Sequence, residues 1–177
     1  MNILTKVGAM LALAMMAPAL PEAANLDEAL AQAGISLYTE NFEPEKEITQ
    51  LEMLRLFGGV MKYTSYLTMD VEDIYRLLKG EGIVKENERA ENSSVLREDA
   101  FVYMVRFLGF ERIAKAEEIF TTQFADQSMI SSGKLGYASI LSGLKVINGN
   151  GGLVKPKDNL TRAEAFVMVY NLLTKTP

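Results

Sequence analysis

Apolar residues recur at helical spacing in three separate stretches of the chain. These stretches are residues 53–61, 101–108 and 166–173. Within each one the apolar side chains lie three and four positions apart, which places them on one face of a helix. A second short helical pattern that ends in a turn precedes each stretch, at 26–35, 71–83 and 134–149. The pattern therefore predicts an all-α protein built from helix pairs.

The helix pairs belong to a repeated unit of helix, glycine turn, polar loop and capped helix. Residues 42–52 and 154–164 share apolar-x-Pro, three polar residues, and then Ile or Leu before Thr-x-x-Glu. A weaker copy has Leu96 in place of the Thr and Asp99 in place of the Glu. Such an echo is the signature of a repeat architecture. The turn after the first helix of each unit needs a positive φ, and it is assigned to Gly34, Gly82 and Gly149.

This organisation divides the chain into five segments. Residues 1–24 are a signal peptide or an N-terminal core helix, 25–66 the first repeat, 67–110 the second, 111–123 a connecting segment, and 124–177 the third repeat. The connecting segment carries a predicted short helix at 112–120.

The N-terminal segment is open to two interpretations. Lys6 precedes an uncharged apolar run at 7–20, and Ala17-Pro18-Ala19 could serve as a cleavage site, as in a secretory signal peptide. The alternative is a buried helix, whose stripe would be Leu4, Val7, Leu11 and Ala14. The run is short for a membrane span, so we predict none.

Composition narrows the possible chemistry. The 177 residues are 49% hydrophobic and 23% charged, as in a globular protein, and include no Cys and no His. Thiolate nucleophiles, Cys/His zinc sites and imidazole acid–base catalysis are therefore excluded. The net charge of −5 is spread without a basic stripe, which argues against a nucleic-acid partner. We predict a non-enzymatic chain without a metal or cofactor.

The Thr-x-x-Glu elements are predicted capping boxes, formed by Thr49 with Glu52 and by Thr161 with Glu164. In such a box each residue satisfies a backbone N–H of the other at the helix start. Loss of a cap costs about 1 kcal/mol, so stability alone can account for these residues.

Arginines at two helix starts are candidate ligand residues. Arg162 is the first residue of the last predicted helix, where the helix dipole disfavours a cation by roughly 0.3–1 kcal/mol. Arg97 occupies the matching place in the second repeat, and Gln50 in the first. A guanidinium beside the N–H groups of a helix start can bind an anion. The alternative is an ion pair with a nearby Asp or Glu.

The run Asn148-Gly149-Asn150-Gly151-Gly152 is the one glycine-rich stretch of the sequence. It lacks the Lys-Ser/Thr of a phosphate-binding loop and does not join a strand to a helix. It is either a tight turn or a set of contacts to a polar ligand such as a sugar. We take its first four residues, Asn148, Gly149, Asn150 and Gly151, as candidate ligand contacts.

Residues 124–173 resemble the S-layer homology (SLH) domain, whose pattern is F-x-D, a helix, G-I-I-x-G, F-x-P, I-T-R-A-E and a further helix. The matching residues are Phe124-Ala125-Asp126, Val146-Ile147-Asn148-Gly149, Pro156 and Leu160-Thr161-Arg162-Ala163-Glu164. The first repeat matches over 34–35 and 42–52. The middle repeat lacks F-x-P, and Leu135 or Tyr137 lies nearest to the family's helix-start Trp.

The resemblance implies three repeats packed as a pseudo-threefold bundle, located outside the cell at a bacterial cell wall or S-layer. It also implies non-covalent binding of an anionic, typically pyruvylated, secondary cell wall polysaccharide in grooves between repeats. In the family the Arg of T-R-A-E contacts the negative charge, a role that passes to Arg162 and Arg97 but not to Gln50.

Two other functions remain open. The first is a protein-interaction or surface-layer assembly module, with other surface-layer proteins as partners and with carbohydrate binding lost. The second is a glycosidase, which would need two carboxylates facing each other roughly 5–9.5 Å apart.

Overall fold

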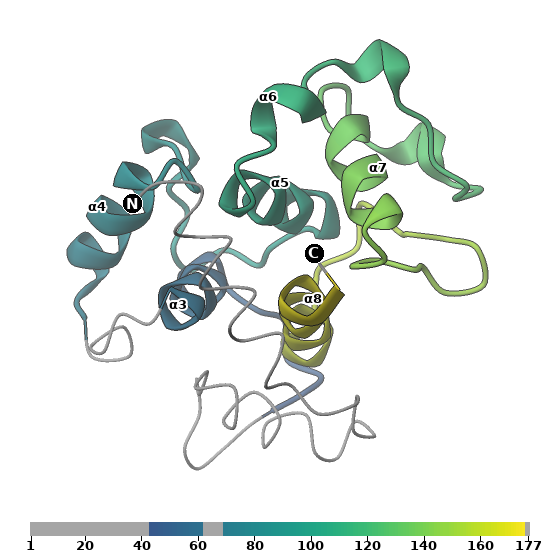
Figure 1. Ribbon diagram of the computed structural model, residues 1–177. Coiled ribbons are helices and arrows are strands. Elements are labelled where there is room, and N and C mark those ends of the chain that lie inside the picture. The colour runs from purple at the N-terminus through teal and green to yellow at the C-terminus, as the bar shows by residue number, and fades with distance from the viewer. Residues whose placement is uncertain (1–42, 62–68, 176–177) are drawn as a thin grey trace.

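The computed structural model describes residues 43–61 and 69–175, and Figure 1 shows that this part of the chain is helical. Its helices are α3 (Gln50–Val60), α4 (Val71–Gly80), α5 (Arg97–Phe107), α6 (Glu111–Ala114), α7 (Leu135–Gly143) and α8 (Arg162–Lys175). Short 3₁₀ turns lie at Glu86–Glu88, Glu117–Ile119 and Gln127–Met129. The described residues form isolated β-bridges but no strand, so the all-α prediction is confirmed. The predictions for 1–24, for the helix at 26–35 and for Gly34 lie outside the described residues.

Three helices with apolar faces form the centre of the molecule. In Figure 1, α3, α5 and α8 lie at the middle, α4 packs outside α3, and α6 and α7 pack outside α5. The largest buried side chains include Phe57, Phe101, Phe107 and Phe166, all on the central helices. The rings of Phe57 and Phe107 stack with their centroids 5.3 Å apart. This core explains the apolar periodicity of 53–61, 101–108 and 166–173.

A closed cycle of backbone hydrogen bonds joins the residues just before the central helices. The N–H of Ile48 donates to Leu160, that of Leu160 to Val95, and that of Val95 back to Ile48, over 2.9, 2.8 and 3.0 Å. Three isolated bridges flank the cycle, at Glu47–Thr161, Thr49–Ser94 and Leu96–Asn159. Segments that are far apart in sequence therefore start their helices side by side.

The glycine turns are partly as predicted. Gly82 ends α4 with φ +73°, and Gly149 also has a positive φ, of +69°. However, Lys145, with φ +61°, is the residue that ends α7 in the way that Gly82 ends α4. The N–H of Val146 returns to Leu141 as that of Ile83 returns to Leu78. Gly149 therefore belongs to the loop that follows, where a Cβ would lie 2.7 Å from the Leu153 carbonyl oxygen.

The predicted helix at 112–120 is present as two short turns, α6 and the 3₁₀ turn Glu117–Ile119. The division falls where α6 packs tightly on α7. A Cβ at Gly136 of α7 would lie only 2.0 Å from the Ala114 carbonyl oxygen, so glycine is required for this close approach.

Candidate functional site

The three helix-start residues singled out by sequence share one backbone environment. Gln50, Arg97 and Arg162 are the first residues of α3, α5 and α8. Their N–H groups donate to the carbonyls of Ser93, Asp158 and Lys46, over 3.0, 3.0 and 2.8 Å. Because the backbone is matched, differences between the three positions reflect the side chains and what surrounds them.

The guanidinium of Arg162 is paired with carboxylates of this chain. Its Nη2 lies 2.5 Å from Oε1 of Glu52 and its Nη1 lies 3.1 Å from Oε2 of Glu43, and the residue is 5% exposed. The sequence analysis offered two roles for Arg162, contact with an anionic ligand or an ion pair with a nearby Asp or Glu. The structure shows the ion pair. The acidic partners come from 119 and 110 positions away along the chain.

The side chain of Gln50 is also satisfied internally, through every group of its amide. Its Nε2 donates to the Tyr103 hydroxyl and to the Glu88 carbonyl, both over 2.7 Å. Its Oε1 accepts from the Ala90 N–H at 2.6 Å and from the Tyr75 hydroxyl. An amide side chain has two N–H donors and two acceptor lone pairs, and all four are used here. Burial raises the pKa of Tyr75 to about 12, so this hydroxyl keeps its proton at neutral pH.

Arg97 differs from both because the polar groups of its side chain are not all paired, and it lines an open groove with a volume of about 370 Å³. Its Nη2 pairs with Glu164. Its Nε is buried and has no hydrogen-bond partner among the described residues. We call this cavity the Arg97 groove; it is lined by residues of α5, α8 and the loop after α7, including Asn148, Gly149 and Asn150. The structure thus brings together four of the six predicted ligand residues.

Gly151 lies beside the groove but does not line it. Gly151 and Gly152 form a two-residue turn between Asn150 and Leu153, whose backbones exchange hydrogen bonds of 2.8 and 3.0 Å. Both glycines have positive φ, +58° and +79°, as a tight hairpin turn of this kind requires. The glycine-rich run therefore combines both interpretations: its first half lines a cavity, and its second half is a turn.

Asp126 holds the groove loop in place. Its carboxylate accepts from the N–H of Val154 at 3.0 Å and from that of Lys155 at 2.7 Å. The N–H of Ala125 donates to Gly152 at 2.9 Å. The Phe124 ring lies where a Cβ at Gly149 would come within 2.8 Å of it. The Phe-Ala-Asp motif thus fixes the geometry of the loop from one side.

The capping residues lie at the edges of this arrangement. Thr49 and Glu52 form a reciprocal capping box at the start of α3. Thr161 and Glu164 exchange the same two bonds, of 3.0 and 3.2 Å, at the start of α8. Glu52 and Glu164 also pair with Arg162 and Arg97. Each Glu therefore caps its own helix and also neutralises the charge of an Arg at the start of a different helix.

The charges that line the Arg97 groove leave it positive. Arg97 and Lys155 face a single carboxylate, that of Glu164, so the lining carries one net positive charge on a protein of net charge −5. An anion can therefore be attracted to this groove although the whole chain is acidic.

A second groove, of about 540 Å³, begins at Gln50 and is named the Gln50 groove. Its cations are Arg106 and Lys134. Arg106 makes a two-pronged pair with Glu88 at 2.6 and 2.8 Å, and Lys134 pairs with Asp99 at 2.5 Å. Burial alone would lower the pKa of Arg106, but the bonds to Glu88 outweigh burial and raise it. The Gln50 groove is larger, yet its charges cancel.

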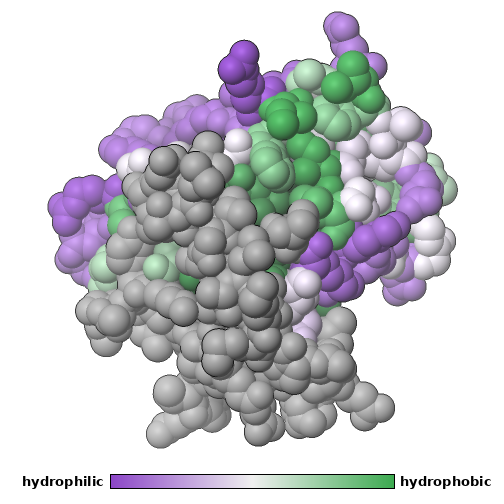
Figure 2. Space-filling view, in the orientation of Figure 1, coloured by the Kyte–Doolittle hydropathy of each residue, from purple (hydrophilic) through white to green (hydrophobic). Residues whose placement is uncertain are grey.

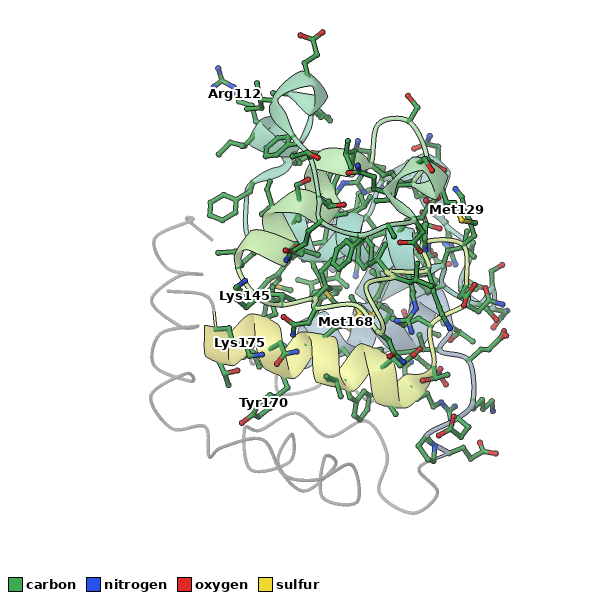
Figure 3. All side chains as sticks on the ribbon, turned by 90° about the vertical axis from the view of Figure 1, so that its right-hand side faces the viewer. Arg112, Met129, Lys145, Met168, Tyr170 and Lys175 are labelled. Carbon is green, nitrogen blue, oxygen red and sulfur yellow. The ribbon has the colours of Figure 1, made fainter. Side chains whose placement is uncertain are left out.

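Sequence reasoning gave no ligand-site role to three polar residues at or beside the Arg97 groove. Lys155 and Asn171 line it, and Asp126 orients its loop. Asn171 carried a detectable signal, since it is a polar residue inside the apolar stretch 166–173. Met168 completes the wall; Figure 3 labels it on the side of α8 toward the rest of the protein.

Residues 123–166 match the S-layer homology domain family. The chain contains an S-layer homology domain. The match spans the Phe-Ala-Asp motif, the groove loop and the Thr-Arg-Ala-Glu segment. S-layer homology domains are non-catalytic anchoring modules, so this domain indicates association with the cell wall and the cell surface. The family prediction is thereby confirmed.

An amylopullulanase from Thermoanaerobacterium thermosulfurigenes is 28% identical to the chain over 152 residues. The alignment covers 76% of this chain but only 8% of the length of that relative. Among the described residues, no helix has the length and apolar character needed to cross a membrane.

Proposed function

We propose that this chain is a non-catalytic cell-surface anchor whose Arg97 groove binds an anionic, pyruvylated secondary cell wall polysaccharide. The observation that carries this proposal is the Arg97 guanidinium, which lines an open groove with a buried Nε that lacks a partner among the described residues. A carboxylate on the polymer supplies the missing acceptor and is attracted by the net positive lining.

The rest of the groove suits a sugar. Asn148 and Asn150 offer amide groups to hydroxyls, and the loop backbone is exposed beside them. Phe101, Val167 and Met168 provide an apolar wall against which a ring can pack. Hydrogen bonds to charged groups contribute about 1.5–3 kcal/mol each, so a few such contacts can hold one residue of a polymer.

We further propose that the repeats 25–66, 67–110 and 124–177 form a pseudo-threefold bundle, with 111–123 as the connecting segment. The closed hydrogen-bond cycle of Ile48, Val95 and Leu160 supports this arrangement, because each repeat contributes one matched residue to it. In this arrangement the grooves lie between neighbouring repeats.

The direct test is binding of the purified chain to cell-wall sacculi. We expect Arg97→Gln, which installs the residue found at the matched position of α3, to lower affinity roughly tenfold, equivalent to about 1.4 kcal/mol. Chemical removal of pyruvyl groups from the wall should have an effect of the same size on the wild type, and no further effect on Arg97→Gln.

Arg112→Gln is the matched control. Arg112 lies on α6, is exposed, and projects at the far end of the molecule from α8 (Figure 3). Arg112→Gln removes one positive charge, as Arg97→Gln does, but at a site distant from the groove. It should leave wall binding unchanged. Equal losses in the two variants would point to non-specific charge attraction instead of a site.

A second candidate function is a surface-layer assembly module. Figure 2 shows hydrophobic surface in the region of α6 and α7, where Ile113 and Ile119 are 54% and 74% exposed. Exposed apolar surface of this kind is typical of protein-binding sites. If assembly is the function, Ile119→Lys should abolish self-association or capture of other surface-layer proteins while sacculus binding is unaffected.

A further inference from the structure

Asn171 of α8 is a buried amide that is satisfied on one side only. The residue is 4% exposed, and its Nδ2 donates to the Val146 carbonyl at 3.1 Å. Since a carbonyl oxygen only accepts, this bond fixes which end of the amide is which. The Oδ1 is then left without a hydrogen-bond partner among the described residues. Buried acceptors are rarely left unpaired in folded proteins.

The position of Asn171 relates this unpaired acceptor to the ligand site. Asn171 lines the Arg97 groove together with Arg97 itself. The groove therefore contains an unpaired donor, the Arg97 Nε, and an unpaired acceptor, the Asn171 Oδ1, contributed by α5 and α8. An anion without an O–H or N–H group, such as sulfate, would satisfy the donor and leave the acceptor unpaired.

Arg106 of α5 occupies the position in its helix that Asn171 occupies in α8. It shows that a buried polar side chain at this position can have hydrogen-bond partners within the protein. Arg106 precedes Asn171 by the same 65 positions that separate Arg97 from Arg162. It is also buried, and its guanidinium is satisfied by Glu88, Glu111 and the Ile83 carbonyl. The unpaired acceptor is therefore particular to the Arg97 groove.

We infer that Asn171 is a specificity-determining contact, and that the ligand presents a hydroxyl or amide N–H to Asn171 Oδ1 while its acidic group binds Arg97. This inference rests on the proposed function and narrows it. The ligand is an acidic sugar with a hydrogen-bond donor near the acidic group, and neither an anion without a donor, such as sulfate, nor a fully capped sugar acid meets both requirements.

The test uses three synthetic probes with one charge. They are methyl 4,6-O-pyruvyl-β-D-glucopyranoside and its 2-deoxy and 3-deoxy analogues, titrated into the full chain by calorimetry. We expect the wild type to bind the parent at least fivefold more tightly than one of the deoxy analogues. Asn171→Leu should bind the parent and that analogue equally. Equal binding of all three probes by the wild type, or discrimination retained in Asn171→Leu, would overturn the assignment.

Two further variants separate the possible failures. Arg97→Gln should weaken binding of all three probes while keeping their order, because it leaves Asn171 in place. If Arg97→Gln binds the parent as the wild type does, or if the wild type binds no probe, the proposed function fails. If Arg97→Gln weakens binding but the wild type binds the parent and both deoxy analogues equally, the proposed function stands and the role of Asn171 fails. Asn171→Ala repeats the test with a smaller side chain in case Asn171→Leu does not fold.

Discussion

The Gln50 groove and the Arg97 groove start from the same backbone hydrogen bonds and differ in how their polar groups are satisfied. In the first, the Gln50 amide uses all of its donors and acceptors, and Arg106 and Lys134 have carboxylate partners. In the second, Arg97 Nε and Asn171 Oδ1 lack partners among the described residues. We interpret the Gln50 groove as a contact that stabilises the fold and the Arg97 groove as a binding site.

The comparison also shows why a helix-start arginine is not a site by itself. Arg162 has the same backbone setting as Arg97, yet it pairs with two carboxylates instead of one and is almost fully buried. What separates the two is the number of acidic partners. Variants in the Gln50 groove should therefore change stability, and variants in the Arg97 groove should change binding.

The largest expected effect on stability comes from Arg106→Met. It removes the cation that pairs with Glu88 and leaves a partly buried carboxylate with the Lys85 N–H as its remaining hydrogen-bond donor, and broken buried pairs cost about 3–5 kcal/mol. We expect the lower end of that range, because Glu88 retains some contact with solvent. Urea denaturation measures the change, with the exposed Arg112→Met as control. A variant as stable as the wild type but deficient in wall binding would make the Gln50 groove a ligand site.

Gln50→Leu should have a smaller effect of the same kind. It leaves the hydroxyls of Tyr75 and Tyr103 and the N–H of Ala90 without their partner, at a cost of about 2 kcal/mol. Wall binding should be unaffected. The exposed Gln123→Leu provides the matched control and should change stability by less than about 0.5 kcal/mol. Loss of wall binding at full stability in Gln50→Leu would contradict our distinction between the two grooves.

The pH dependence of stability should reflect Glu98, a buried carboxylate that binds Lys134 of the Gln50 groove. Burial alone would raise its pKa, but hydrogen bonds from Lys157, Ser131 and Lys134 outweigh burial and lower the pKa to about 2. Because the folded pKa lies below the ordinary value of 4.5, the carboxylate stabilises the fold at neutral pH. This contribution is lost as the pH falls from about 4.5 to about 2.

Glu98→Gln tests this expectation. We expect the variant to be about 1.5 kcal/mol less stable than the wild type at pH 7, equivalent to one hydrogen bond to a charged group. The difference should shrink on acidification and vanish near pH 2. Thermal unfolding of both proteins at pH 7, 4 and 2 provides the measurement. A difference that stays constant with pH would show that the Glu98 charge is not what stabilises this contact.

Much of the fold could be predicted from the sequence, because it depends on local patterns. Apolar spacing identified the central helices, and the Thr49–Glu52 box and the positive φ of Gly82 follow from capping and turn chemistry. The Phe124-to-Glu164 pattern identified the family that the comparison confirms. The end of α7 at Lys145 was missed because a lysine there must adopt a positive φ, which pattern reasoning assigns to glycine.

The candidate site was less predictable, because it depends on which distant residues meet. The choice between Arg97 and Arg162 depends on Glu43 and Glu52, which reach Arg162 across more than a hundred residues of sequence. The unpaired oxygen of Asn171 depends on the Val146 carbonyl, 25 positions away. Asn171 itself stands out as a polar residue in an apolar stretch, but neither of these pairings can be predicted from local spacing.

The most direct test of the Arg97 groove follows the arginine Nε–H resonances by NMR while a pyruvylated wall fragment is added, with each signal assigned by its loss in an Arg→Lys variant. Our account predicts a large shift of the Arg97 signal and little change at Arg106 and Arg162, whose guanidinium groups are already paired within the protein. A shift centred on Arg106 or Arg162, with Arg97 unmoved, would contradict it.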